Sequence, residues 1–197
     1  MQYTRLTERF DEAFQFSANL HRRQFRKGTG IPYMTHLLGV TALVLEDGGD
    51  EDQAIAALLH DAAEDQGGRK ILEEIRLRFG DRVASIVDGC TDSYDVPKPA
   101  WRHRKEKYIE HLRSAPFEVR RVSLADKLHN AHSILADLKR SGAGVWDRFN
   151  GGKEGTMWYY RTLVKVFQEL DSSILVDELS YVVENIEQIS TTKDRRT

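Results

Sequence analysis

The segment HDAAED, residues 60–65, places four ionisable side chains in six positions at the end of an apolar stretch. Such groups are costly beside a core unless a cation compensates the buried charge. The imidazole of His60 and the carboxylate of Asp61 are ligand types that a borderline divalent metal takes. Glu64 and Asp65 follow one helical turn later, where they can orient a ligand or carry a proton. The alternative for this segment taken alone is a helix end that frays into water with its acids exposed.

A second polar group occurs within the apolar pattern of SLADKLHNAHS, residues 123–133. Asp126 and Asn130 are four residues apart and therefore share a helix face. The carboxylate suits a metal ligand, and the amide suits a substrate hydroxyl or phosphate. His129 and His132 point elsewhere on the helix, so packing or capping is the better interpretation for both.

The histidine at position 36 opens a helix just after a Pro-Tyr turn, and it supplies the ligand that the other two segments lack. Metal sites built from distant helices are common in helical bundles. A divalent ion there lowers the pKa of a bound water and polarises a phosphoryl oxygen. The basic residues just before it, among them Arg26 and Lys27, suit a polyanion. These spacings predict a metal-dependent phosphohydrolase.

The elements that must position these residues are all predicted to be helices. Apolar residues recur at helical spacing, and glycines or prolines separate the segments. The expected helices cover about 6–20, 34–46, 50–60, 70–79, 82–90, 101–114, 117–139, 155–169 and 173–188. Asp81 is the expected N-cap of the helix over 82–90. No alternating strand pattern occurs, so the sequence predicts an all-α fold with one domain over 1–189 and a disordered tail over 190–197.

Composition limits the class of protein further. Hydrophobic residues make up 40% and charged residues 30% of 197 residues, which is the balance of a globular protein. Cys90 is the one cysteine, so no internal disulfide forms and a reducing cytoplasm is the expected compartment. No apolar run approaches a membrane span, and the net charge of −2 gives no global attraction for a nucleic acid polymer. The basic clusters at 21–27 and 101–107 are either solvated helix faces or phosphate contacts. The oligomeric state stays open.

Four ordered blocks give a more specific prediction. They are HRRQFRKGTGIPYMTH, AALLHDAAED, FGDRVASIVDGCT and LADKLHNA. Together they resemble the HD-domain superfamily of metal-dependent phosphohydrolases and, within it, the hydrolase domain of RelA/SpoT homologues. The resemblance covers most of residues 7–140 and continues more weakly to about 170. It implies an HD-domain helical bundle of about eight to ten helices, of the type of a stand-alone small alarmone hydrolase.

The resemblance also assigns roles to individual residues. It implies one divalent ion, Mn2+, held by His36, His60, Asp61 and Asp126. Glu64 and Asp65 match the acidic pair that orients or deprotonates the attacking water. The residues that match the lining of the nucleotide pocket are Arg26, Lys27 and Asn130. Tyr160 matches a tyrosine of a later helix that contacts the nucleotide. The implied reaction removes the 3′-pyrophosphate of guanosine tetra- or pentaphosphate and leaves GDP or GTP.

Three positions depart from the pattern of that family. Ser123 stands where a lysine often precedes the LAD motif, TDSYD replaces a TK-containing segment at 91–95, and Gln66 follows the acidic pair where threonine is common. None is a predicted metal ligand, so hydrolysis stays the prediction. The alternative substrates are an adenosine analogue, a nucleoside monophosphate or a phosphorylated dinucleotide such as NADPH. A non-catalytic nucleotide sensor is disfavoured because all four ligands and both acids are present.

Overall fold

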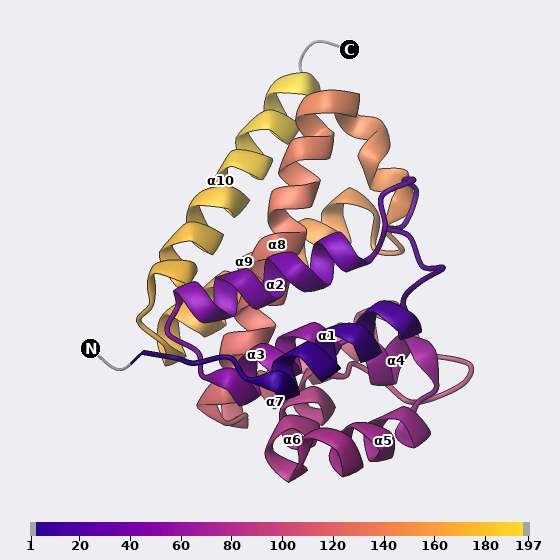
Figure 1. Ribbon diagram of the computed structural model, residues 1–197. Helices are drawn as coiled ribbons and strands as arrows, with labels where there is room; N and C mark the ends of the chain where they lie inside the picture. Colours follow the sequence, from indigo (N-terminus) through magenta and orange to yellow (C-terminus); the bar gives the residue numbers. More distant parts are fainter. Residues whose placement is uncertain (1–2, 195–197) are drawn as a thin grey trace. The chain divides into compact units, whose positions relative to one another are not determined.

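The computed structural model describes residues 3–194, and in that range helices account for all the regular structure apart from an isolated bridge between Phe25 and Pro32 (Figure 1). The helices are α1 (Glu8–Leu20), α2 (Met34–Glu46), α3 (Glu51–Leu59), α4 (Ala62–Gln66), α5 (Arg69–Phe79), α6 (Asp81–Cys90), α7 (Trp101–Ser114), α8 (Phe117–Ser141), the 3-10 helix η1 (Gly142–Arg148), α9 (Gly152–Leu170) and α10 (Ile174–Asp194). The predicted all-α fold is therefore confirmed. None of the helices described is long and apolar enough to cross a membrane.

The chain forms two compact units. The first comprises residues 1–98 and 115–125, and the second comprises residues 99–114 and 126–197. Helix α8 contributes its residues up to Ala125 to the first unit and those from Asp126 onward to the second. The single domain over 1–189 stays a prediction.

Helix α3 is the centre of the first unit. It packs against α1, α2 and α6, and its residues 54–59 are fully buried. The run AIAALL explains this position, because a helix that is apolar on nearly every side must be surrounded by other elements. Burial of each large side chain, such as Leu58 or Leu59, contributes about 1.5–3 kcal/mol. Because α3 is packed on all sides, the position of His60, which follows it directly, is fixed as well.

Polar contacts fix the start of α3. Asp50 is the N-cap, and its carboxylate accepts a hydrogen bond from the backbone N–H of Gln53 at 3.0 Å. Arg121 on α8 donates to the side-chain oxygen of Gln53 at 2.7 Å and to the carboxylate of Asp47 at 2.8 Å. Glu51 and Asp52 make the first turn of α3 acidic, and α8 is tied to the start of this helix within the same unit.

Two helix junctions in the first unit differ from the sequence-based expectation. Helix α3 ends at Leu59, and His60 and Asp61 form the junction to the short helix α4 instead of lying inside one helix. The expected N-cap at Asp81 is wrong, because Gly80 occupies that position with φ of +92° and Asp81 begins α6. A positive φ is readily adopted only by glycine, so Gly80 both closes α5 and opens α6.

Aromatic and basic side chains from α7 and α9 pack together in the second unit. Trp101 lies against Gly151, where an added Cβ would approach its ring to 2.7 Å. The guanidinium of Arg102 lies over the ring of Trp158, and its Nε donates to Glu106 at 2.7 Å. The ammonium of Lys105 lies 5.2 Å from the centre of the Tyr159 ring. Residues of the basic run at 101–107 therefore have a packing role through cation–π contacts.

The last helix extends further than expected. Helix α10 continues to Asp194, past the boundary placed at residue 190. Ser190 is buried and its hydroxyl donates to the carbonyl of Ile186 at 2.7 Å, while Lys153 on α9 donates to the Ser190 carbonyl at 3.4 Å. These contacts prolong the helix into the segment expected to be a tail. The end of that tail, residues 195–197, lies outside the described residues.

Candidate metal and phosphohydrolase site

Two buried histidines and one carboxylate converge in the first unit. His36 lies in the first turn of α2, and His60 follows the end of α3. They are 1% and 2% exposed, and their ring centres are 5.2 Å apart. Oδ2 of Asp61 lies 3.1 Å from Nε2 of His60 and 3.5 Å from Nε2 of His36. Within the first unit, three of the predicted metal ligands therefore lie together.

The surroundings of this triad orient its donor atoms. Nδ1 of His60 lies 2.8 Å from the carbonyl oxygen of Ala57, which can only accept, so Nδ1 carries the proton. Nε2 of His60 then keeps its lone pair on the side facing Asp61. The hydroxyl of Tyr33 donates to Oδ2 of Asp61 at 2.6 Å, and its ring meets His36 edge-on at 5.5 Å. A histidine that binds a metal through one ring nitrogen commonly donates a hydrogen bond from the other to a carbonyl, as His60 does to Ala57. The donor set fits a divalent cation.

The fourth predicted ligand, Asp126, lies in the second unit on α8 and is buried. Its carboxylate accepts hydrogen bonds from Nδ2 of Asn130 and Nζ of Lys127, both at 2.5 Å. Although burial alone lowers the pKa of Lys127, the adjacent Asp126 carboxylate raises it well above its ordinary value, so the ammonium stays charged. Like His36 and His60, buried Asp126 offers one atom of a metal-ligand type.

Glu64 is held by a loop that follows α6. Nζ of Lys98 donates to Oε1 of Glu64 at 2.6 Å, and the backbone N–H of Asp92 donates to Oε2 at 3.1 Å. Both carboxylate oxygens are therefore hydrogen-bonded, one of them to an ammonium group. A hydrogen bond to an ammonium group is charge-assisted and stronger than one between neutral groups, so it holds the Glu64 carboxylate in place.

Asp65 has different partners. Nε2 of Gln24 donates to Oδ2 of Asp65 at 2.7 Å, and Oε1 of Gln24 accepts from Gln66 at 2.6 Å and from Nδ1 of His21 at the same distance. Partial removal from water and the negative charge of Asp61 raise the pKa of Asp65 to about 6. A carboxyl group that titrates near neutral pH can both give and take a proton. The adjacent acids thus differ in their electrostatic surroundings.

The predicted substrate-binding residues are divided between the units. Arg26 is half-buried before α2, with its guanidinium 5.8 Å from the centre of the Tyr33 ring, and Lys27 is exposed. In the second unit, Asn130 donates to Asp126 and Tyr160 is buried on α9. Their contact with a nucleotide stays a prediction.

Sequence reasoning missed the side chains that orient the acids. Tyr33 is three residues before His36 and one helical turn away, so the spacing contained a signal for it. Gln24 and Lys98 reach Asp65 and Glu64 from distant segments, and no local spacing predicts these pairs.

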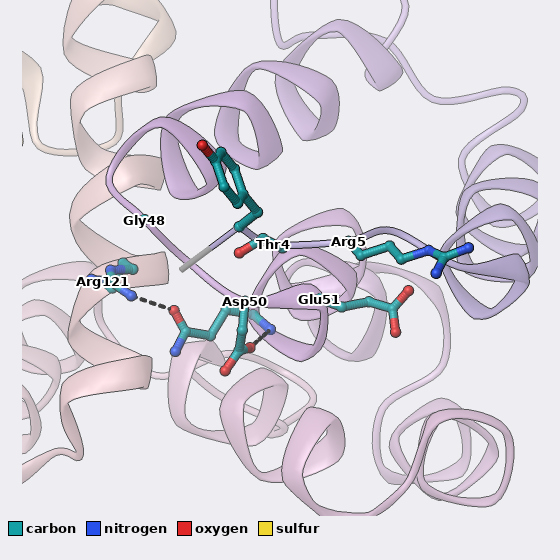
Figure 2. A pocket seen from close by; sticks show the side chains of 8 residues that line it. Thr4, Arg5, Gly48, Asp50, Glu51 and Arg121 are labelled. Atoms are coloured by element: carbon teal, nitrogen blue, oxygen red, sulfur yellow. Dashed lines mark hydrogen bonds between the residues drawn. The ribbon is translucent and has the colours of Figure 1, made fainter. Parts of the chain in front are cut away.

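A pocket of about 400 Å3 lies at the amino end of α3 (Figure 2). Its lining includes the cations Arg5 and Arg121 and the anions Asp50 and Glu51. Arg121 is bound to Gln53 and Asp47, so its charge is already compensated. None of the predicted site residues lines this pocket, and the candidate site stays at the histidines.

Comparison with known proteins defines the class. Residues 13–157 match the HD domain family, and the chain belongs to that family. Among its relatives is the guanosine-3′,5′-bis(diphosphate) 3′-pyrophosphohydrolase MESH1 of Xenopus tropicalis, which is 41% identical over 138 residues, or 68% of this chain and 72% of the relative.

Solved structures agree with this assignment. A metazoan orthologue of SpoT, described as hydrolysing ppGpp, matches 92% of this chain and 97% of its own chain with a TM-score of 0.75 and 26% identity. The lmo0812 protein of Listeria monocytogenes matches 76% of this chain and 96% of its own, with a TM-score of 0.68 and 31% identity. The expected HD-domain fold is therefore confirmed.

Proposed function

We propose that this protein hydrolyses the 3′-pyrophosphate of guanosine tetra- or pentaphosphate, releasing pyrophosphate and leaving GDP or GTP. The observation that carries the proposal is the position of Asp61 Oδ2, 3.1 and 3.5 Å from the Nε2 atoms of His60 and His36. Two buried imidazoles with a partly buried carboxylate suit a divalent ion, and they occur in a chain that is 41% identical over 138 residues to a guanosine-3′,5′-bis(diphosphate) 3′-pyrophosphohydrolase.

The metal ligands in this proposal are His36, His60, Asp61 and Asp126. Asp126 follows Ala125 directly in α8, and Ala125 belongs to the same unit as the histidines. The proposed ion is Mn2+, as the resemblance to RelA/SpoT homologues implies. Two imidazoles with two carboxylates suit this ion and other first-row divalent metals. When bound, the ion polarises a phosphoryl oxygen and lowers the pKa of a coordinated water.

The protein's own acids then move the protons. Glu64 receives a proton from the attacking water, whose oxygen forms a bond to the phosphorus attached to the ribose 3′ oxygen. The bond between that phosphorus and the 3′ oxygen breaks, and the leaving 3′ oxygen takes up a proton. Asp65 suits this delivery because partial removal from water raises the pKa of its carboxyl group. One water is consumed, and the products are the nucleotide with a free 3′ hydroxyl and pyrophosphate.

Basic and polar residues bind the nucleotide in the same proposal. Arg26 and Lys27 lie before α2 and contribute positive charge toward the phosphates. Asn130 orients Asp126 and presents an amide to the ribose, and Tyr160 contacts the nucleotide from α9. The proposed compartment is the cytoplasm, where the buried thiol of Cys90 stays reduced.

The departure at Ser123 does not favour another substrate. Ser123 is 1% exposed, and its hydroxyl lies 3.7 Å from Sγ of Cys90 within the first unit. This position is thus part of the interior, where a small side chain fits. Its difference from the family pattern concerns packing.

The test is product identification. The manganese-loaded protein is incubated with guanosine tetraphosphate, and the products are separated by anion-exchange chromatography, with His60→Ala as the control. GDP and pyrophosphate from the parent protein alone support the proposal. Intact guanosine tetraphosphate from a folded, metal-loaded sample contradicts it, and the adenosine analogue, nucleoside monophosphates and NADPH are then assayed in the same way.

A further inference from the structure

The loop at residues 91–98 is tied to helices α5 and α6 by one aromatic side chain, that of Tyr94. The hydroxyl of Tyr94 donates to the carboxylate of Asp88 on α6 at 2.5 Å. The guanidinium of Arg69 on α5 lies over the Tyr94 ring, 4.6 Å from its centre. Burial and the nearby Asp88 charge raise the pKa of Tyr94 to about 12, so the hydroxyl stays a donor throughout the neutral range. Tyr94 belongs to the TDSYD segment that distinguishes this chain from its family pattern.

The same loop supplies both hydrogen-bond donors to Glu64. The backbone N–H of Asp92 binds one carboxylate oxygen and Lys98 binds the other. Tyr94 lies between these two positions in the chain, so its contacts with Asp88 and Arg69 fall within the segment that joins both donors.

Lys98 depends on this support. Its side chain is 40% exposed, and long exposed side chains lose considerable rotamer freedom when held in one geometry. The neighbouring Val96 is almost fully exposed and provides no packing for the loop. The contacts of Tyr94 with Asp88 and Arg69 restrict the conformations of the loop. Fewer loop conformations then compete with the one in which Lys98 binds Glu64.

We infer that Tyr94 is a positioning residue for Glu64, which acts through the loop at 91–98 by holding Lys98 and the Asp92 amide against the Glu64 carboxylate. The inference rests on the proposed function, because it assigns Glu64 as the group that takes the proton from water. Among the described residues, no recorded hydrogen bond or ring contact joins Tyr94 to a proposed metal ligand or to Glu64. Its removal therefore changes the turnover number without removing a ligand of the metal.

Two variants of Tyr94 separate its contacts. Tyr94→Phe removes the hydrogen bond to Asp88 and keeps the ring beneath Arg69, whereas Tyr94→Ala removes both contacts. Asp88 is exposed, so water replaces the lost hydroxyl and the fold is retained. Tyr181→Phe is the matched control, since Tyr181 is exposed on α10 in the other unit.

The turnover number is expected to fall roughly fivefold in Tyr94→Phe and roughly tenfold or more in Tyr94→Ala, on the scale of one to two hydrogen bonds. KM, the affinity for Mn2+ and the melting temperature stay near the parent values, and Tyr181→Phe behaves as the parent. Lys98→Met shows the same loss of turnover, and Lys98→Arg restores most of it because the positive charge returns.

Hydrogen exchange of the Asp92 amide provides a second readout that needs no substrate. This N–H donates to Glu64, so it is protected in the parent protein and exchanges faster in Tyr94→Ala. Faster exchange together with the selective loss of turnover supports the inference. Unchanged exchange, unchanged turnover, or a loss of turnover that follows a loss of metal affinity or melting temperature overturns it. A parent protein that leaves guanosine tetraphosphate intact contradicts the proposed function, and the exchange rates of the parent and Tyr94→Ala still decide whether Tyr94 holds the loop.

Discussion

The hydroxyl of Tyr33 donates to Oδ2 of Asp61 at 2.6 Å, the same oxygen that faces both histidines. One oxygen is therefore shared between an orienting donor and the proposed metal position. Tyr33 precedes α2 and Asp61 follows α3, so this hydrogen bond joins the two segments that carry His36 and His60.

Tyr33→Phe is expected to weaken Mn2+ binding roughly tenfold to a hundredfold, the usual effect of losing a group that orients a metal ligand. The ring is retained, so its packing against His36 is unaffected. Calorimetric titration of the metal-free protein with Mn2+ measures the change. An unchanged dissociation constant would show that Asp61 is oriented without Tyr33.

Loss of a proposed ligand has a larger effect. Asp61→Ala and Asp126→Ala each remove an anion from the set, so metal binding and hydrolysis are expected to disappear together. The matched control is Asp147→Ala, which removes an exposed carboxylate from η1, away from the proposed site residues and the loop at 91–98. Metal analysis of purified variants, paired with product assays, checks this, and Asp126→Ala with full metal content would exclude Asp126 as a ligand.

Glu64→Gln tests the chemical step separately from metal binding. The amide cannot take a proton from water, and the turnover number is expected to fall roughly a hundredfold or more. Mn2+ affinity is retained because no proposed ligand changes. Full turnover in this variant would assign proton transfer to Asp65 or to water alone.

The sequence predicted the helices and the proximity of His60 to Asp61 for physical reasons. Helix α2 has the predicted bounds because a continuous helix-compatible run stops at the Gly48 turn, where φ is +80°. His60 and Asp61 are neighbours in the chain, so their proximity needed no knowledge of tertiary structure. The structure has no helix over residues 91–100, between the expected helices over 82–90 and 101–114, because Pro97 and Pro99 exclude one there.

The partners of the two acids were not predictable in this way. Periodicity assigns Glu64 and Asp65 to helix faces, but it does not indicate which distant segment covers each face. Lys98 reaches Glu64 from the end of an irregular loop, and Gln24 reaches Asp65 from the turn after α1. These pairs depend on the packing of α4 against its neighbours, which no local pattern encodes.

The metal is also expected to stabilise the fold. The unfolded chain lacks the assembled site, so Mn2+ at about 100 times its dissociation constant adds about 2.7 kcal/mol to the free energy of unfolding. Thermal melts with Mn2+ and with a chelator measure the difference. In Asp61→Ala the two melting temperatures should coincide, and a persistent difference would indicate metal binding elsewhere on the chain.

The raised pKa of Asp65 predicts how the stability of the metal-free protein depends on pH. The folded state holds this proton up to about pH 6, whereas the unfolded chain releases it near 3.8. The stabilisation is therefore complete below pH 3.8 and is lost as the pH rises through 6.

Asp65→Asn removes the cost of the ionised carboxylate beside Asp61, and the amide oxygen of the new side chain still accepts from Gln24. Its melting temperature is expected to exceed that of the parent at pH 7.5 and to approach it at pH 4.5. Chelator-treated samples at both pH values measure this, and an equal difference at the two would show that ionisation of Asp65 does not destabilise the fold.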